Sequence, residues 1–183
     1  SPNTLVISAA PEATGRFGGE CTASGCDDNV FINQMRNANA ADVLDCVGLQ
    51  YTDGAVPPLS TSGAPVASPQ HYSWYYGVLV NLYRGQFPDS PLCITGIGYL
   101  TVEDLDVRLP SSLSWGRSTT VAQHASWLAE AAQAAQSGTI VRMFIIDNVD
   151  GNTQEGVRQL GYAIVRPDGS CPACAALLGV LES

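Results

Sequence analysis

The sequence predicts an α/β fold in which parallel strands are covered by helices. Four short apolar segments rich in β-branched residues alternate with longer segments of helical periodicity. Each short segment is apolar throughout, as strands are when helices cover a parallel sheet. Proline, glycine, tyrosine and acidic residues gather in the loops after these segments, so we expect a ligand site at the carboxyl ends of the strands. The predicted strands lie near residues 4–10, 42–51, 91–97 and 140–148.

Helices are predicted in the intervals between these strands and at the end of the chain. The first covers about 29–40, and residues 71–87 form a second with aromatic residues near its start. The alanine-rich segment 119–138 is the clearest helix, and Gly138 ends it. After the last predicted strand, the sequence GYAIVRPDGS indicates a short extended segment with a turn, and a final helix follows within 171–183.

The length and charge of the chain exclude several classes of partner. Its 183 residues fit one domain, and 17 acidic residues against 8 arginines, with no lysine, give a net charge of −9. Such a surface repels phosphate backbones and anionic membranes, so neither nucleic acid nor membrane is an expected partner. The longest apolar runs are too short to span a bilayer, and no signal peptide is visible. Glycine-rich nucleotide motifs are absent, and we expect no cofactor.

Cysteine usage indicates an extracellular protein. The count is even, two pairs are close in sequence, and the chain has no lysine, which together favour an oxidising compartment. The candidates for local disulfides are Cys21, Cys26, Cys171 and Cys174. Cys46 and Cys93 lie inside predicted strands.

Two other interpretations of the short-range cysteines are weaker. Together the four could hold a zinc ion, but the first pair is widely spaced and the second lies near the other end of the chain, so we expect no metal. The CPAC motif could be redox-active, because the start of a helix lowers a thiol pKa. That motif normally follows an early strand, however, and here it precedes the last helix. Local structural disulfides are therefore favoured.

The order of the strand-end motifs resembles a known enzyme family. The succession LVIS, DVLDCVGLQYTDG, PLCITGIGYL, FIIDNVD and GYAIVRPDGSCPAC resembles the second half of a bacterial secreted TIM-barrel glycoside hydrolase. Its clan places one glutamate after strand four and another at the end of strand seven. The likeness covers nearly the whole chain and maps it onto strands five to eight. It implies a single (βα)4 half-barrel domain over residues 1–183, secreted and able to bind carbohydrate.

The sequence departs from that family at its catalytic positions. Relatives carry Thr-Glu where this chain has Thr95-Gly96, so Gly96 stands at the position of the lost nucleophile. The strand-four glutamate, the acid/base of the family, would lie before residue 1. Retaining hydrolysis needs two carboxyl groups about 5 Å apart, so the resemblance implies lost or weak O-glycosyl hydrolase activity. Further altered positions, which we assign to substrate binding or a substitute site, are Gln50, Tyr51, Asp147 and Asn148.

Carboxylates that follow the predicted strands are candidates for a replacement acid pair. Most loop acids on so acidic a protein are expected to be solvated. Asp147 is the exception, because it directly follows the apolar residues 144–146 and burial would raise its pKa. Its expected partner is Asp53 or Glu103. The other acids of this set are Asp104, Asp106 and Asp150.

Aromatic residues near the strand ends are candidates for stacking against sugar rings. Tyr51 and Tyr99 follow strands and are the stronger candidates, whereas Trp74 and Tyr76 are expected to pack between helix and sheet. Trp115 lies in the loop SSLSWGRS and would line or cover a pocket.

The two histidines show no catalytic pattern. His124 is expected on the surface of the alanine-rich helix, and His71 begins a helix without a serine or cysteine motif around it. They do not lie at the spacing of a metal site.

Three functions remain open. The favoured one is a glycoside hydrolase-like, carbohydrate-binding half-barrel with lost or weak activity. The first alternative is a structural or assembly subunit, because four parallel strands leave two open edges and a closed barrel needs eight. In that case the partner is a second copy or a complementary half-barrel, and the chain is not expected to be a free monomer. The further alternative is an active glycosidase that uses Asp147 with a second loop carboxylate.

Overall fold

Three parallel strands form the centre of the protein. In the computed structural model, which describes residues 4–13, 15–138, 140–151 and 156–182, these strands pair in the order β3–β4–β5. Strand β3 spans Val47–Gly54, β4 spans Leu92–Tyr99 and β5 spans Val141–Ile146, and both pairings are parallel. The predicted α/β class with a parallel sheet is confirmed.

The first predicted strand is less regular than expected. Residues 4–10 run beside β3, but they contribute only one isolated parallel bridge, between Ile7 and Cys46. The Ser8 amide donates to the Cys46 carbonyl at 3.2 Å, and the Gly48 amide then donates to the Ser8 hydroxyl at 2.8 Å. A side chain thus takes the place of the next backbone acceptor. Gly48 permits this approach, because a Cβ there would lie 2.5 Å from the Ser8 carbonyl oxygen.

The boundaries of the other predicted strands also shift. Strand β3 begins at Val47 rather than near 42, because Ala40–Asp42 form a 3-10 turn, η1. The chain after β5 continues as β6 (Asn148–Asp150), which pairs in parallel with β7 (Ala163–Val165). Helix α4 (Val157–Tyr162) connects these two strands and was not predicted. Near the N-terminus, β1 (Cys21–Thr22) and β2 (Gly25–Cys26) form a small antiparallel hairpin.

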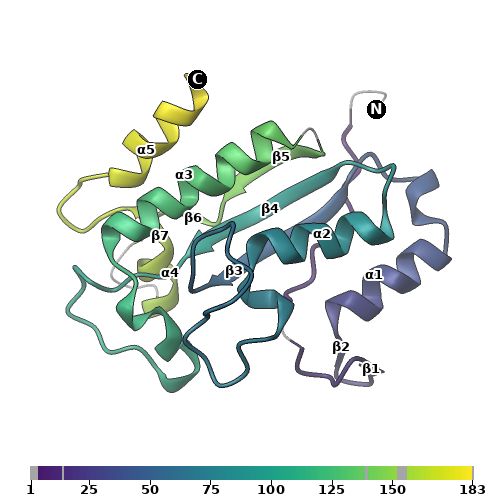
Figure 1. Ribbon diagram of the computed structural model, residues 1–183, viewed down its shortest axis with the longest axis horizontal. Coiled ribbons are helices and arrows are strands. Elements are labelled where there is room, and N and C mark those ends of the chain that lie inside the picture. The colour runs from purple at the N-terminus through teal and green to yellow at the C-terminus, as the bar shows by residue number, and fades with distance from the viewer. Residues whose placement is uncertain (1–3, 14, 139, 152–155, 183) are drawn as a thin grey trace.

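The remaining helices lie where the sequence predicts them. Helices α1 (Asp28–Asn37), α2 (Tyr76–Gln86), α3 (Val121–Ser137) and α5 (Pro172–Leu181) surround the strands, and α5 packs along α3 (Figure 1). A short 3-10 helix, η2 (Tyr72–Trp74), precedes α2, and η3 (Ser111–Ser118) precedes α3. Helix α3 begins with a capping box, in which the side chains of Thr120 and Gln123 accept from each other's backbone amides.

The main core lies between the central sheet and the helices. Leu49, Ile94 and Ile97 of the sheet are fully buried against Leu79 of α2 and Leu128 of α3. This burial stabilises the layered arrangement, because apolar surface removed from water is the main favourable contribution to folding.

All six cysteines form disulfides. The predicted local pairs Cys21–Cys26 and Cys171–Cys174 are confirmed. The third pair, Cys46–Cys93, was not predicted; both residues are fully buried, and the bond ties the beginning of β3 to β4. Three disulfides are consistent with an extracellular protein. Among the described helices, none combines the length and the apolar character needed to cross a bilayer.

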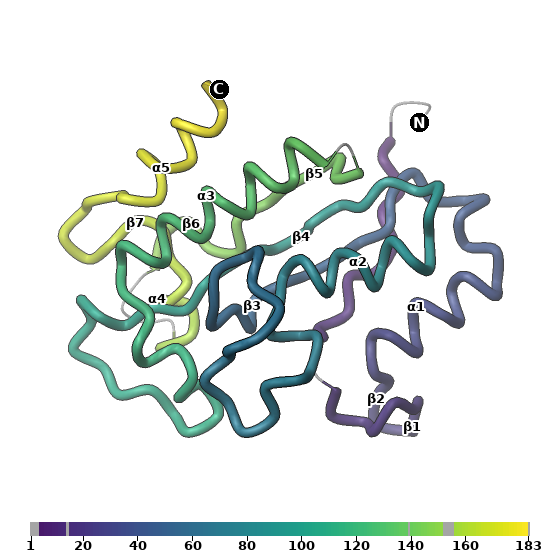
Figure 2. Tube along the Cα trace, viewed as in Figure 1, coloured from purple at the N-terminus to yellow at the C-terminus, as the bar shows by residue number. Residues whose placement is uncertain are grey.

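Two long loops gather at the carboxyl ends of the central strands. Figure 2 shows the loop after β3 and the loop after β4 side by side, at the end of the sheet where strand β4 finishes. They contact each other, because Trp74 at the end of the first loop packs edge-to-face on Trp115 in η3. This end of the sheet is where the sequence predicts a ligand site.

Candidate functional site

A cavity of about 560 Å³ lies at the carboxyl ends of the strands. Its walls come from the segment after residues 4–10, the end of β3, the short helices η2 and η3, and helix α4. The side chains that matter for its chemistry are Glu12, Asp53, His71, Trp74, Trp115 and Arg158.

Arg158 is the cation at the centre of the polar wall. Its Nη2 lies 3.4 Å from Glu12 Oε1 and donates to Thr52 Oγ1 at 3.2 Å. Its guanidinium carbon lies 5.8 Å from the centre of the Tyr162 ring, and the Tyr162 hydroxyl donates to the Thr52 carbonyl at 2.5 Å. These contacts attach helix α4 to the end of β3, so the cation is held in place beside the carboxylates.

Asp53 is the carboxyl group best suited to proton transfer. Burial raises its pKa to about 6, and the negative charge of Glu12 acts in the same direction. The positive charges of Arg158 and Arg16 oppose this rise without cancelling it. A group with a pKa near the working pH is present in both protonated and ionised forms, which general acid–base chemistry requires.

Asp147 lies beside Gly96, the position at which the family resemblance would place a glutamate. It directly follows β5, and its amide donates to the Ile97 carbonyl at 2.8 Å. A Cβ added at Gly96 would lie 3.1 Å from Asp147 Oδ1 and 3.7 Å from Gln50 Cγ. A side chain at position 96 would therefore start next to Asp147 and Gln50.

The pKa of Asp147 is shifted less than that of Asp53. Asp147 remains solvent-exposed overall, and partial loss of water around its carboxyl raises its pKa, while Arg158 opposes the rise. Because Arg158 acts on both aspartates, a single guanidinium is shared between the two predicted acids.

The expected stacking role of Tyr51 and Tyr99 needs correction. Tyr51 is 2% exposed and Tyr99 is 0% exposed, and their rings pack edge-to-face with centres 5.7 Å apart. The Tyr51 hydroxyl donates to the Trp74 carbonyl at 2.9 Å. Buried rings offer no face to a sugar. The aromatic residues that do line the cavity are Trp74 and Trp115, whose ring centres lie 5.8 Å apart.

The other predicted binding residues are divided between the site and the scaffold. Gln50 pairs with Gly96 across β3 and β4 and lines a small recess with Glu12 and Asp53. Asn148 instead donates from Nδ2 to the Gln159 carbonyl at 2.7 Å, so it holds α4 against β6.

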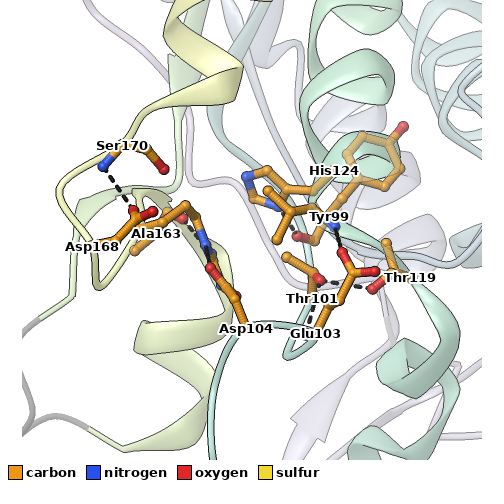
Figure 3. Close-up of polar contacts among 11 residues, drawn as sticks. Tyr99, Thr101, Glu103, Asp104, Thr119, His124, Ala163, Asp168 and Ser170 are labelled. Carbon is orange, nitrogen blue, oxygen red and sulfur yellow. Dashed lines mark hydrogen bonds and ion pairs between the residues drawn. The ribbon is translucent and has the colours of Figure 1, made fainter.

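The histidines differ in position from what the sequence suggests. His71 lines the cavity, and its Nδ1 lies 2.8 Å from Ser73 Oγ. His124 was expected on the surface but is 1% exposed, because its turn of α3 faces the end of β4. Its Nδ1–H donates to the Tyr99 carbonyl at 2.5 Å (Figure 3). Burial lowers the pKa of His124 to about 4, so the ring is neutral at physiological pH.

Two acids of the loop after β4 have structural roles. Glu103 Oε2 accepts from the Val121 amide at 2.6 Å and so caps the beginning of α3. Asp104 forms a two-point ion pair with Arg166, which is 3% exposed and also donates from Nη1 to the Ala163 carbonyl at 2.7 Å (Figure 3). Glu103 is therefore engaged away from Asp147, and Asp53 is the better candidate for its partner.

Sequence reasoning missed Glu12, Arg158 and Tyr162. Glu12 follows the first apolar segment, so the strand-end rule used for the other acids also applies to it. The sequence signal for Arg158 was weaker. It is one of only 8 cationic side chains in the chain, and this rarity could have drawn attention to it. Tyr162 lies in the helix that was not predicted.

Comparisons with known proteins give no further assignment. No family model, no curated protein and no solved structure matches this chain. Within the described residues, no group of three or more histidine, cysteine or acidic side chains is placed to hold a metal ion.

Proposed function

We propose that this protein is a glycoside hydrolase-like domain that binds carbohydrate in the cavity at the carboxyl ends of its strands, with lost or weak O-glycosyl hydrolase activity. In this proposal the sheet is one half of a (βα)8 barrel and the protein is secreted. The order of the segment 4–10, β3, β4 and β5, all parallel, supports the half-barrel interpretation.

The observation that carries the proposal is the pairing of aromatic and polar walls in one cavity. Trp74 supplies most of the accessible apolar surface, because Trp115, which packs on it, is only 7% exposed, while Glu12, Asp53 and Arg158 supply hydrogen-bonding groups in the same cavity. Sugar rings have apolar faces and hydroxyl edges, and sites for such ligands combine apolar walls with a few fixed polar groups. The size of the cavity, about 560 Å³, also fits the usual range for small-ligand sites.

Weak hydrolysis is inferred from the missing nucleophile. Gly96 lies within β4, three residues before its end, and offers no carboxylate there; the nearest side-chain atom to its would-be Cβ is Asp147 Oδ1. Covalent catalysis at that position therefore has no attacking group.

Binding is tested by isothermal calorimetry and thermal shift with a panel of neutral oligosaccharides. At least one should bind, and Trp74→Ala should weaken its affinity by about tenfold, because an aromatic contact of this kind is worth roughly 1 kcal/mol or more. Leu59→Ala is the matched control, since Leu59 is an exposed apolar residue of the same loop region. No binding by any member of the panel, or equal effects of the two variants, would count against the proposal.

The raised pKa of Asp53 favours an active glycosidase as a second candidate. Protonated Asp53 would act as general acid and Asp147 as the second carboxylate. The protein would then release a chromogenic aglycone, with a rate that falls as the pH rises through about 6. Both Asp53→Asn and Asp147→Asn should abolish the release. Retention of full activity in either variant would exclude this pair.

An exposed strand edge favours an assembly subunit as a third candidate. An apolar groove of about 410 Å³ follows β5 between α3 and α5, and Leu181 beside it is 77% exposed. Strand edges and exposed apolar surface favour pairing with a second copy or a complementary half-barrel. Light scattering distinguishes this candidate, because an assembly should have the same mass with and without sugar, and Leu181→Asp should shift it toward the monomer.

A further inference from the structure

Half of the cationic side chains of this acidic protein gather around the candidate site. Arg16 and Arg158 line the cavity, and Arg108 and Arg117 line an adjoining depression that also contains Arg158. The chain has only 8 cationic residues against 17 acids. The group of four arginines is therefore a local concentration of positive charge on a protein that is acidic overall.

The adjoining depression is the more strongly cationic of the two. It has a volume of about 690 Å³ and lies between the loop after β4, η3 and α4. Three of its lining residues are arginines, namely Arg108, Arg117 and Arg158, and its other lining residues are apolar or uncharged. Four acids face these arginines from outside it. Glu12 contacts Arg158, Asp53 and Asp147 interact electrostatically with Arg158, and Asp106 lines a neighbouring hollow together with Arg108 and Arg117.

Two of these guanidinium groups keep their hydrogen-bonding capacity for a ligand. Arg108 and Arg117 are exposed and form no ion pair with any residue that the structure describes. Part of the Arg158 guanidinium group is already engaged, because its Nη2 contacts Glu12 and Thr52. A planar guanidinium binds carboxylate and sulfate groups through two parallel hydrogen bonds, which makes arginine the residue suited to anion recognition.

We propose that this depression binds the anionic group of an acidic sugar, so that the ligand of the site is a glycan carrying carboxylate or sulfate. The inference rests on the proposed carbohydrate binding. Arg158 and Leu113 belong to the walls of both the cavity and the depression, so one glycan chain can lie across both. A neutral ring contacts Trp74 while the charged group of the next ring contacts Arg108 and Arg117.

The net charge decides between an acidic glycan and a nucleic acid. A phosphate backbone bears charge at every step and would meet the acidic surface beyond the depression, since the chain as a whole has a net charge of −9. A glycan with its charge on individual sugar groups can place that charge at the arginines alone.

The test compares charged and uncharged forms of one ligand by isothermal calorimetry. Oligosaccharides of neutral rings that end in a single uronic acid and their methyl esters form one pair, and neutral oligosaccharides that carry a single sulfate ester with their unsulfated forms another. In at least one pair the charged form should bind about tenfold more tightly, corresponding to two exposed charge contacts, and the difference should shrink in high salt. The pair that shows this difference identifies carboxylate or sulfate as the recognised group.

Arginine variants assign the effect to the depression. The double variant Arg108→Gln, Arg117→Gln should bring the charged ligand to the affinity of the uncharged one. Arg84→Gln is the matched control, because Arg84 is an exposed arginine in the last turn of α2, outside the depression. Equal affinity for charged and uncharged forms in both pairs, or an unchanged preference in the double variant, overturns the inference.

The two proposals fail in different ways. If uncharged oligosaccharides bind, Trp74→Ala weakens that binding, and the charged forms bind no more tightly than the uncharged ones, the cavity proposal is supported and the anionic subsite is excluded. If the charged forms bind through Arg108 and Arg117 while Trp74→Ala has no effect, the anion site stands and the sugar-stacking cavity falls.

Discussion

Replacing Asp53 by asparagine should stabilise the protein at neutral pH. Asp53 lies at the end of β3, where burial and the nearby Glu12 raise its pKa from 3.8 to about 6. A raised pKa means that the folded chain holds this proton more tightly than the unfolded chain does. The protonated form therefore stabilises the fold relative to the ionised form, and asparagine resembles the protonated form at every pH.

The size of the effect follows from the difference between the two pKa values. About two units at about 1.4 kcal/mol per unit give roughly 3 kcal/mol. The advantage of the wild-type proton is complete below pH 3.8 and disappears as the pH rises through about 6. Asp53→Asn should therefore match wild type near pH 3.5 and exceed its free energy of unfolding by about 3 kcal/mol above pH 7.

Urea denaturation at a series of pH values measures this difference directly. Subtracting the wild-type curve from the variant curve removes the titrations that the two proteins share. The control is Asp89→Asn, which removes one negative charge from an exposed turn before β4. If Asp53→Asn differs from wild type by the same amount at pH 3.5 and pH 8, Asp53 does not titrate differently in the folded and unfolded chains, and its proposed role in proton transfer loses its basis.

Three other perturbations test the structure elsewhere. Removing the Cys46–Cys93 disulfide by double alanine substitution should cost about 4 kcal/mol in urea denaturation, because it closes a loop with a sequence separation of 47; a loss of 1 kcal/mol or less would show that the bond constrains the unfolded chain little. Asp104→Asn should cost about 2 kcal/mol, visible as a lower Tm, because the buried arginine that it pairs with loses its counter-charge. Gly96→Glu should raise the pKa of Asp147, followed by carbon-detected NMR titration, because it places a second carboxyl beside it; an unchanged titration would show that the new side chain points elsewhere.

The parts of the fold that the sequence predicts well depend on local patterns. Helix α3 was expected over 119–138 and spans Val121–Ser137, because its alanine content and its capping residues act within a few positions. The segment 4–10 was expected to be a strand on equally apolar grounds. Its pairing with β3 is interrupted by the Ser8 hydroxyl, and the decisive partner, Gly48, lies 40 residues away. That contact exists only in the folded chain.

The same distinction applies to the site. The strand-end rule correctly places Asp53 and Asp147 at one edge of the sheet, near a shared cation. It does not predict that this cation is Arg158, whose contact with Glu12 spans 146 residues. The burial of Tyr51 could not be foreseen either, because a strand that is buried on both faces shows no alternation from which an exposed side can be identified.

Ligand binding and protonation should be coupled at this site, because a bound ligand strengthens the same influences that raise the pKa of Asp53. Burial is the largest of these causes, so a ring that fills the cavity removes more water and raises this pKa further. An anionic group in the adjoining depression acts in the same direction through direct repulsion and by partly neutralising Arg158, which at present stabilises the carboxylate. Binding near pH 6 is therefore accompanied by proton uptake, and affinity falls as the pH rises above 6. A carboxyl that becomes protonated when sugar binds is in the form that a general acid requires, so even weak hydrolysis would begin from the correct protonation state.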